Sequence, residues 1–136
     1  MQSALVDSGP LIALFDRDDR FHALVKTYLA KAQLKLVTTW PVLTEVCAIL
    51  PQNAADDFLE FVCRGGLRIA QLAPDDLSVM LALRRKYADR PMDFADASLV
   101  ALALRDDEDR IVSVDSDFEI YRLAGRKRFR NLLSAR

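Results

Sequence analysis

Short apolar runs and longer amphipathic stretches alternate along the chain. The short runs are bounded by charged residues, Gly or Pro, which is typical of β-strands. They occupy residues 4–6, 34–39, 67–72 and 110–114, with a weaker one at 129–133 that predicts an edge strand. The amphipathic stretches repeat apolar residues at helical spacing and predict helices at residues 9–15, 21–29, 41–50, 54–63, 75–87 and 92–104. Strands that alternate with helices predict an α/β fold, with a mostly parallel central sheet covered by helices on both faces.

The helix predicted at 92–104 is the most apolar of these. It carries no charged residue from Ala97 to Leu104, and its apolar residues lie on nearly all sides, so we expect it to be buried. Two carboxylates, Asp93 and Asp96, lie at its start. A helix N-terminus favours negative charge, but a buried carboxylate without a partner is costly. Asp96 therefore needs a cation, a hydrogen-bond network or a metal ion.

Acids also follow the predicted strands. Asp7 ends the first strand, Asp115 and Asp117 follow the fourth, and Glu45 lies one turn into the helix after the second. In open α/β sheets, ligands bind at the edge formed by the carboxyl ends of the strands. Taken singly, Asp7 is equally well explained as the cap of the next helix, and Glu45 as a surface residue that compensates the helix dipole.

Together these acids predict a site for a divalent cation. Clustered carboxylates repel one another, and Mg²⁺ or Mn²⁺ relieves that repulsion because these ions prefer oxygen ligands. No cysteine lies near the acids and the single histidine, His22, is on a surface-like helix, which disfavours zinc. An all-acid metal site suits phosphodiester hydrolysis, in which the ion polarises a phosphoryl oxygen and activates water. Ser8 and Ser113 are candidates to orient a carboxylate or that water.

Length, charge and cysteine content limit the number of domains, the binding partners and the cellular location that we expect. The 136 residues fit one domain, and a net charge of −1 gives no global attraction to nucleic acid. The chain has no acid after Glu119, so its basic end is a candidate for holding phosphate. That end carries Arg122, Arg126, Lys127, Arg128, Arg130 and Arg136. No signal peptide or membrane-spanning stretch is found, and Cys47 and Cys63 are expected to be buried free thiols, so we expect a cytoplasmic protein without membrane contact.

Four acidic segments occur in order along the chain: LVDSGPLIAL at residues 5–14, TEV at 44–46, DASLVALA at 96–103 and SVDSDF at 113–118. In order and spacing they resemble the signatures of the PIN-domain ribonucleases and, more narrowly, of the VapC-like toxins of VapBC toxin–antitoxin systems. Each segment alone is a weak signal, but four in order are specific. The resemblance covers essentially the whole chain.

The resemblance implies a single PIN domain over residues 1–136, folded as a three-layer α/β/α sandwich. It implies a Mg²⁺- or Mn²⁺-dependent endoribonuclease that acts on RNA. It also implies inhibition by a small antitoxin protein and frequent formation of a homodimer.

Residue by residue, the resemblance implies that Asp7, Glu45 and Asp96 are the first three catalytic acids. The fourth is ambiguous between Asp115 and Asp117, and we favour Asp115, which lies nearer the strand end. The implied metal ligands are Asp7, Asp96 and Asp115, with Asp117 assisting.

Three more residues are candidates to support those ligands. Ser8 and Ser113 carry hydroxyls beside the first and fourth acids, and Ser113 stands where the family often has Thr. Asp93 is an extra acid that either joins the edge of the site or only caps its helix.

Two other functions remain open. The first is a non-catalytic PIN-fold module that binds RNA or protein, although a binding role alone would not need four converging carboxylates. The second is a phosphotransfer or phosphatase domain, which would use a nucleophilic Asp and usually a nearby Lys. Only Lys127 follows a late strand, and this disfavours the second alternative.

Overall fold

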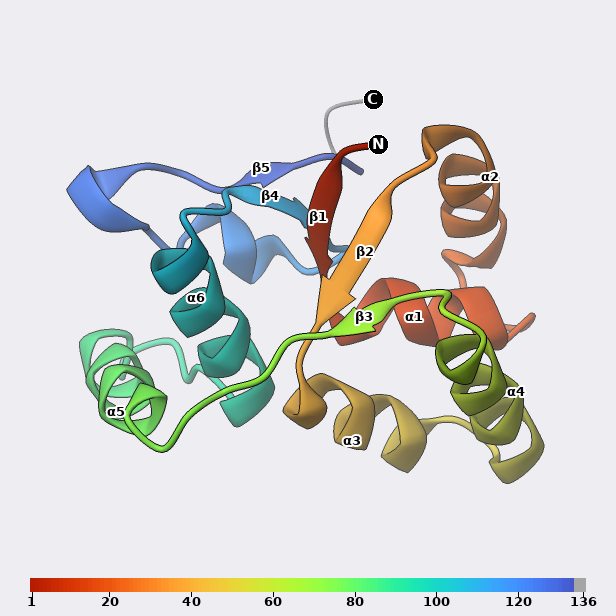
Figure 1. Ribbon diagram of the computed structural model, residues 1–136, viewed down its shortest axis with the longest axis horizontal. Coiled ribbons are helices and arrows are strands. Elements are labelled where there is room, and N and C mark those ends of the chain that lie inside the picture. The colour runs from red at the N-terminus through yellow and green to blue at the C-terminus, as the bar shows by residue number, and fades with distance from the viewer. Residues whose placement is uncertain (134–136) are drawn as a thin grey trace.

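A five-stranded parallel sheet forms the centre of the computed structural model, which describes residues 1–133 (Figure 1). The order across the sheet is β3-β2-β1-β4-β5, and all four strand pairs are parallel. Leu5 of the central strand pairs with Val37 on one side and with Ile111 on the other. The strands are β1 (Ser3–Val6), β2 (Lys35–Thr38), β3 (Arg68–Ile69), β4 (Arg110–Val112) and β5 (Arg130–Asn131).

Within residues 1–133, six α-helices surround the sheet. They are α1 (Ser8–Phe15), α2 (His22–Ala32), α3 (Trp40–Ile49), α4 (Gln52–Cys63), α5 (Asp76–Lys86) and α6 (Phe94–Asp106). The chain crosses the sheet in one direction from β1 to β2 to β3 and in the opposite direction from β3 to β4. Because crossovers between parallel strands are right-handed as a rule, this reversal places α5 and α6 on the face opposite α2 and α4. Figure 1 shows α5 and α6 on one side of the sheet, and α3 below the carboxyl ends of β1 and β2. The predicted α/β/α architecture with a parallel sheet is confirmed.

Helix α6 is the core helix that its sequence predicts. Every residue from Ala95 to Ala103 is buried, so this segment packs on all sides. Helix α6 packs against both α5 and α3. The first turn of α6 is thereby fixed at the carboxyl edge of the sheet.

The ends of some elements differ from the predicted ones. The fourth strand stops at Val112, because the N–H of Ser113 donates to the Asn131 side chain (3.2 Å) instead of continuing the ladder. The strand predicted at 67–72 shortens to β3. Helix α1 begins at Ser8, with Asp7 as its N-cap. The prediction that both cysteines are buried is wrong, because Cys63 lies exposed at the end of amphipathic α4 and Cys47 is only partly buried.

Among residues 1–133, no helix is both long and apolar enough to cross a membrane.

Candidate active site

Asp7 directly follows the central strand β1 and is only 3% exposed. Its backbone N–H donates to the Val112 carbonyl at the end of β4 (3.2 Å). The carboxylate is held on both sides, because Oδ1 accepts from the Ser8 N–H (2.5 Å) and Oδ2 accepts from the Ser113 hydroxyl (2.9 Å). Burial raises the pKa of Asp7 to about 6, against the lowering effect of these hydrogen bonds.

Asp96 lies in the first turn of α6 and is 6% exposed. Its backbone N–H donates to Asp93 Oδ1 (2.7 Å), and its Oδ2 accepts from the Tyr121 hydroxyl (3.1 Å). Burial, followed by repulsion from Asp7 and Asp93, raises the pKa of Asp96 to about 8. A carboxylate with this pKa is costly to ionise unless a cation is close.

Asp115 completes a compact group of three acids. It follows β4 and caps a short 3₁₀ helix, η1 (Ser116–Glu119), where its Oδ1 accepts from the Asp117 N–H (2.9 Å). Asp7, Asp96 and Asp115 each offer a carboxylate oxygen, and these oxygens lie within 4.8 Å of one another. Three mutually repelling carboxylates at this separation, two of them buried, suit a hard divalent cation such as Mg²⁺ or Mn²⁺.

Glu45 joins this group through Ser8. The Ser8 hydroxyl donates to Glu45 Oε1, and the Ser8 N–H donates to Asp7, so one residue connects the two carboxylates. Burial and the charge of nearby Asp93 raise the pKa of Glu45. Thus the structure brings together the predicted acids Asp7, Glu45, Asp96 and Asp115, with Ser8 and Ser113 between them.

Asp117 is arranged differently. Its Oδ1 accepts from Arg90 Nη1 (3.1 Å), so its carboxylate is in an ion pair, while its N–H orients Asp115. Among the described residues, the acids whose oxygens lie close enough together to share a metal ion do not include Asp117. Its predicted role as an assisting ligand remains a prediction.

Asp93 is the N-cap of α6, and its hydrogen bond to the Asp96 N–H is that of a helix cap. It also lines the same open groove as Glu45. Of the two interpretations of Asp93 made from the sequence, the structure shows the helix cap, and a role of Asp93 at the site remains a prediction.

Tyr121 was not among the residues singled out from the sequence. Its ring is fully buried and packs edge-on against Tyr87 (5.1 Å) and Phe118 (5.2 Å). Burial and the Asp96 carboxylate raise the pKa of its hydroxyl, which stays protonated as a donor. Tyr121 lies outside any regular helix or strand, so periodicity gave no signal for it.

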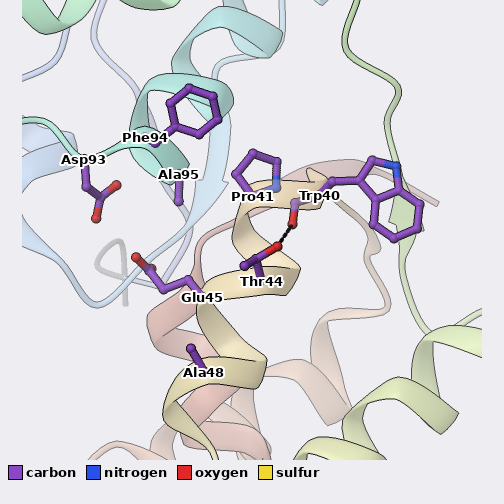
Figure 2. Close-up of a pocket in the computed structure, with 8 residues that line it drawn as sticks. All are labelled: Trp40, Pro41, Thr44, Glu45, Ala48, Asp93, Phe94 and Ala95. Atoms are coloured by element: carbon purple, nitrogen blue, oxygen red, sulfur yellow. Dashed lines mark hydrogen bonds between the residues drawn. The ribbon is translucent and has the colours of Figure 1, made fainter.

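An open groove of about 630 Å³ adjoins the acids and was also not foreseen (Figure 2). It lies between the N-terminal turns of α3 and α6. Its lining consists of Trp40, Pro41, Thr44, Glu45, Ala48, Asp93, Phe94 and Ala95. Figure 2 shows the carboxyl groups of Glu45 and Asp93 on the same side of this groove.

The basic C-terminal stretch is partly neutralised within the chain. Asp109 pairs with Lys127 (3.3 Å) and Arg130 (3.1 Å), and Arg122 Nη1 donates to backbone carbonyls, including that of Glu119 (2.7 Å). Arg126 and Arg128 are exposed, and Arg136 lies outside the described residues. This stretch is therefore less available for phosphate than its sequence suggests.

Comparison with known proteins identifies the fold. The structure is similar to that of the Mycobacterium tuberculosis protein VapC20, a toxin that cleaves the sarcin–ricin loop (TM-score 0.78, 19% identity, 86% of this chain and 93% of that chain). It is also similar to VapBC2 from Rickettsia felis, solved bound to a DNA fragment from its promoter (TM-score 0.64, 12% identity, 96% of this chain and 98% of that chain).

No match was found among curated proteins. The family described as "PIN domain" matches residues 4–124, a span that contains all four acids. The chain therefore belongs to the PIN domain family.

Proposed function

We propose that this protein is an endoribonuclease that hydrolyses RNA phosphodiester bonds with Mg²⁺ or Mn²⁺, and that it is the toxin of a toxin–antitoxin pair. The observation that carries the chemistry is the meeting of Asp7, Asp96 and Asp115 with carboxylate oxygens within 4.8 Å of one another. These three residues would hold the cation. Membership of the PIN domain family supports the assignment as a nuclease.

Each residue of the site has a definable task. A bound divalent cation would polarise a phosphoryl oxygen and lower the pKa of a bound water. Ser113 and the Ser8 N–H keep the Asp7 carboxylate in one orientation, and Tyr121 does the same for Asp96. Such supporting hydrogen bonds tune metal ligands strongly. The raised pKa of Glu45 suits a group that takes up a proton from the attacking water.

The proposal predicts metal-dependent RNA cleavage that requires Asp96. Purified wild-type protein should cleave total RNA with Mg²⁺ or Mn²⁺, and both a chelator and Asp96→Asn should reduce the rate at least about 100-fold, because loss of a charge-stabilising group typically costs that much. The matched control is Asp106→Asn, which changes an exposed acid at the far end of the same helix and should cleave as wild type does.

Other results of this experiment would contradict the mechanism or favour one of the alternative functions. Equal cleavage by wild type and Asp96→Asn would contradict this mechanism. The non-catalytic binding module would be favoured if the protein bound RNA without cleaving it and if calorimetry detected no Mg²⁺ binding that depends on Asp7 and Asp96. Such dependence is tested with Asp7→Asn and Asp96→Asn. Hydrolysis of small phosphoesters without RNA cleavage would favour a phosphatase.

The partners belong to the same proposal. The similarity to VapBC2, together with the resemblance of the sequence to VapC-like toxins of VapBC systems, supports a small antitoxin as the inhibitor of this chain. We further propose a homodimer and a cytoplasmic location. Sedimentation of the purified chain tests the dimer, and inhibition of cleavage by the product of an adjacent small gene tests the antitoxin.

A further inference from the structure

The side chain of Asn131, the last residue of the edge strand β5, continues the pairing of that strand with β4. The backbone ladder between the two strands reaches Leu132, whose N–H donates to the carbonyl of Ile111 (2.8 Å). Next along β4, Asn131 Oδ1 accepts from the Ser113 N–H (3.2 Å) and Asn131 Nδ2 donates to the Ser113 carbonyl (2.9 Å). Figure 1 shows β5 beside β4 at the edge of the sheet. One amide side chain thus pairs with both backbone groups of Ser113.

Ser113 in turn lies between two of the acids that would hold the cation. It is only 2% exposed, and its hydroxyl accepts from the Asp115 N–H (2.9 Å). The hydroxyl has a single proton to donate, and the Asp7 carboxylate at 2.9 Å is a nearer acceptor than the Asp115 carbonyl at 3.4 Å. Ser113 therefore connects the backbone of one acid with the carboxylate of the other.

Loss of the Asn131 amide would disturb this connection. The N–H and carbonyl of buried Ser113 would lose this partner, and because unpaired buried backbone groups are unfavourable, the chain there would shift toward water or another partner. A hydroxyl that moves with this backbone cannot keep its hydrogen bonds to both Asp7 and Asp115. Metal ligands have to stay within about 0.5 Å of their productive positions, so a small shift is enough to weaken a metal site.

We propose that Asn131 is a positioning residue of the metal site, which fixes Ser113 and thereby holds Asp7 and Asp115 in the arrangement that binds the cation. This inference rests on the proposed metal-dependent function. It adds to the site a residue beyond 4–124, the span that the PIN domain family matches. It also couples the edge strand to the site: if docked β5 favours metal binding, bound metal must favour docked β5 by the same factor.

The Mg²⁺ dependence of RNA cleavage separates positioning from a general loss of folded protein. Asn131→Ala should raise the Mg²⁺ concentration for half-maximal rate about tenfold, which is typical when a group that orients a metal ligand is lost. The rate at saturating Mg²⁺ should stay within about twofold of wild type, because the ligands themselves are unchanged. Titration calorimetry without RNA should show the same loss of Mg²⁺ affinity.

Leu132→Ala is the matched control in the same segment. The Leu132 side chain packs against the hydrophobic core, and its removal leaves both the backbone hydrogen bond to Ile111 and the Asn131 amide in place. We expect Leu132→Ala to lower the melting temperature through lost packing while Mg²⁺ affinity stays that of wild type.

A double-mutant cycle tests whether Asn131 acts through Ser113. Ser113→Ala removes the hydroxyl that joins Asp7 and Asp115, so it should lower Mg²⁺ affinity at least as much as Asn131→Ala does. If Asn131 acts through this hydroxyl, the double variant should bind Mg²⁺ no more weakly than Ser113→Ala alone.

Hydrogen exchange tests the coupling in the unmodified protein. The Leu132 N–H donates to Ile111 and the Leu133 N–H donates to Asn131 Oδ1 (3.2 Å), so exchange of these two groups measures undocking of β5. Saturating Mg²⁺ should slow their exchange about tenfold, the same factor as the affinity loss in Asn131→Ala, because the coupling is reciprocal. Mg²⁺ should have no such effect in Asp96→Asn.

Several results would overturn the inference while leaving the proposed function in place. These are wild-type Mg²⁺ affinity in Asn131→Ala, an equal loss of affinity in Leu132→Ala, additive losses in the double variant, or exchange of the two N–H groups that Mg²⁺ does not slow. If the wild-type protein neither binds Mg²⁺ nor cleaves RNA, both the inference and the function on which it rests are rejected.

Discussion

Asp7 and Asp96 reduce the stability of the folded state when they are ionised. Both are buried, and burial raises their pKa values to about 6 and about 8. Their hydrogen bonds to Ser113 and Tyr121 compensate only part of this cost, since the pKa values stay high. Perturbed pKa values of this kind are concentrated at functional sites.

The sequence predicted these acids but not all of the residues that hold them. Asp7 and Asp115 could be found because they follow strands, and Asp96 because it precedes an uncharged helix. Ser8 and Ser113 were found as hydroxyls next to those acids. Tyr121 was missed, because its contact with Asp96 spans 25 positions and depends on how an irregular segment packs.

Tyr121→Phe tests the hydrogen bond to Asp96 directly. Removing the hydroxyl keeps the buried ring and its packing against Tyr87 and Phe118, but leaves Asp96 Oδ2 without this donor. We expect Mg²⁺ affinity to fall about 10-fold or more, as is typical when a group that orients a metal ligand is lost. Titration calorimetry measures the affinity, and circular dichroism confirms that the fold is kept.

Tyr87→Phe is the control for this experiment. The Tyr87 hydroxyl accepts from the Arg122 N–H (2.9 Å) and does not contact Asp96, so its loss should leave Mg²⁺ affinity unchanged. Equal affinities of Tyr121→Phe and wild type would show that the contact with Asp96 does not support metal binding.

At the scale of elements, the site depends on two helices that begin at the same edge of the sheet. Thr39 precedes α3 at its N-cap position, and its hydroxyl is hydrogen-bonded to Ser98 of α6 (2.6 Å) instead of to the first turn of α3; both residues are fully buried. This contact fixes the start of α3 against α6. Glu45 and Asp96 are therefore carried by two helices whose N-terminal turns cannot move independently.

Asp93→Ala tests the cap of α6. Asp93 accepts from the Asp96 N–H, and loss of an N-cap side chain typically costs about 1 kcal/mol of the free energy of unfolding. We expect Asp93→Ala to be destabilised by this amount in urea unfolding. Asp93→Asn should stay close to wild type, because Asn caps a helix as well as Asp does.

The comparison also separates two roles of Asp93. If both variants lose stability equally, the negative charge matters more than the cap. If Asp93→Ala is as stable as wild type, the cap contributes nothing measurable and the capping role is rejected.

The existence of the elements could be predicted more reliably than their ends. Helical spacing and short apolar runs predicted every α-helix and every strand of the sheet. The last residues of β4 could not be predicted, because the Asn131 side chain replaces a strand partner there. The groove could not be predicted either, since it arises only when the starts of α3 and α6 meet.

At the scale of the whole molecule, charge is distributed so that the basic end of the chain is partly neutralised at Asp109, while the acids gather at one edge of the sheet. The net charge of −1 therefore conceals a local excess of negative charge. That excess makes the stability of the metal-free protein depend on pH.

The direction of this dependence follows from the pKa values of Asp7 and Asp96. In the folded chain these are about 6 and about 8, above the ordinary value of 3.8. Between about pH 4 and pH 8 the folded state thus binds more protons than the unfolded state, so the free energy of unfolding falls as the pH rises. Protonation at low pH removes the repulsion, and ionisation at high pH restores it.

We therefore expect the melting temperature of the metal-free protein to fall between pH 5 and pH 8. Asp96→Asn removes one charge and keeps an oxygen acceptor for Tyr121, so at pH 8 it should raise the free energy of unfolding by about 1–3 kcal/mol, with a smaller effect at pH 5. Mg²⁺ should stabilise wild type more at pH 8 than at pH 5, because the ligands must be ionised to bind it. Calorimetry at both pH values, with and without Mg²⁺ and with Asp106→Asn as the control, measures all three effects. A wild-type stability that rises over this range, or an Asp96→Asn variant with the same slope, would mean that these carboxylates are not held as close together in solution as they are in the structure.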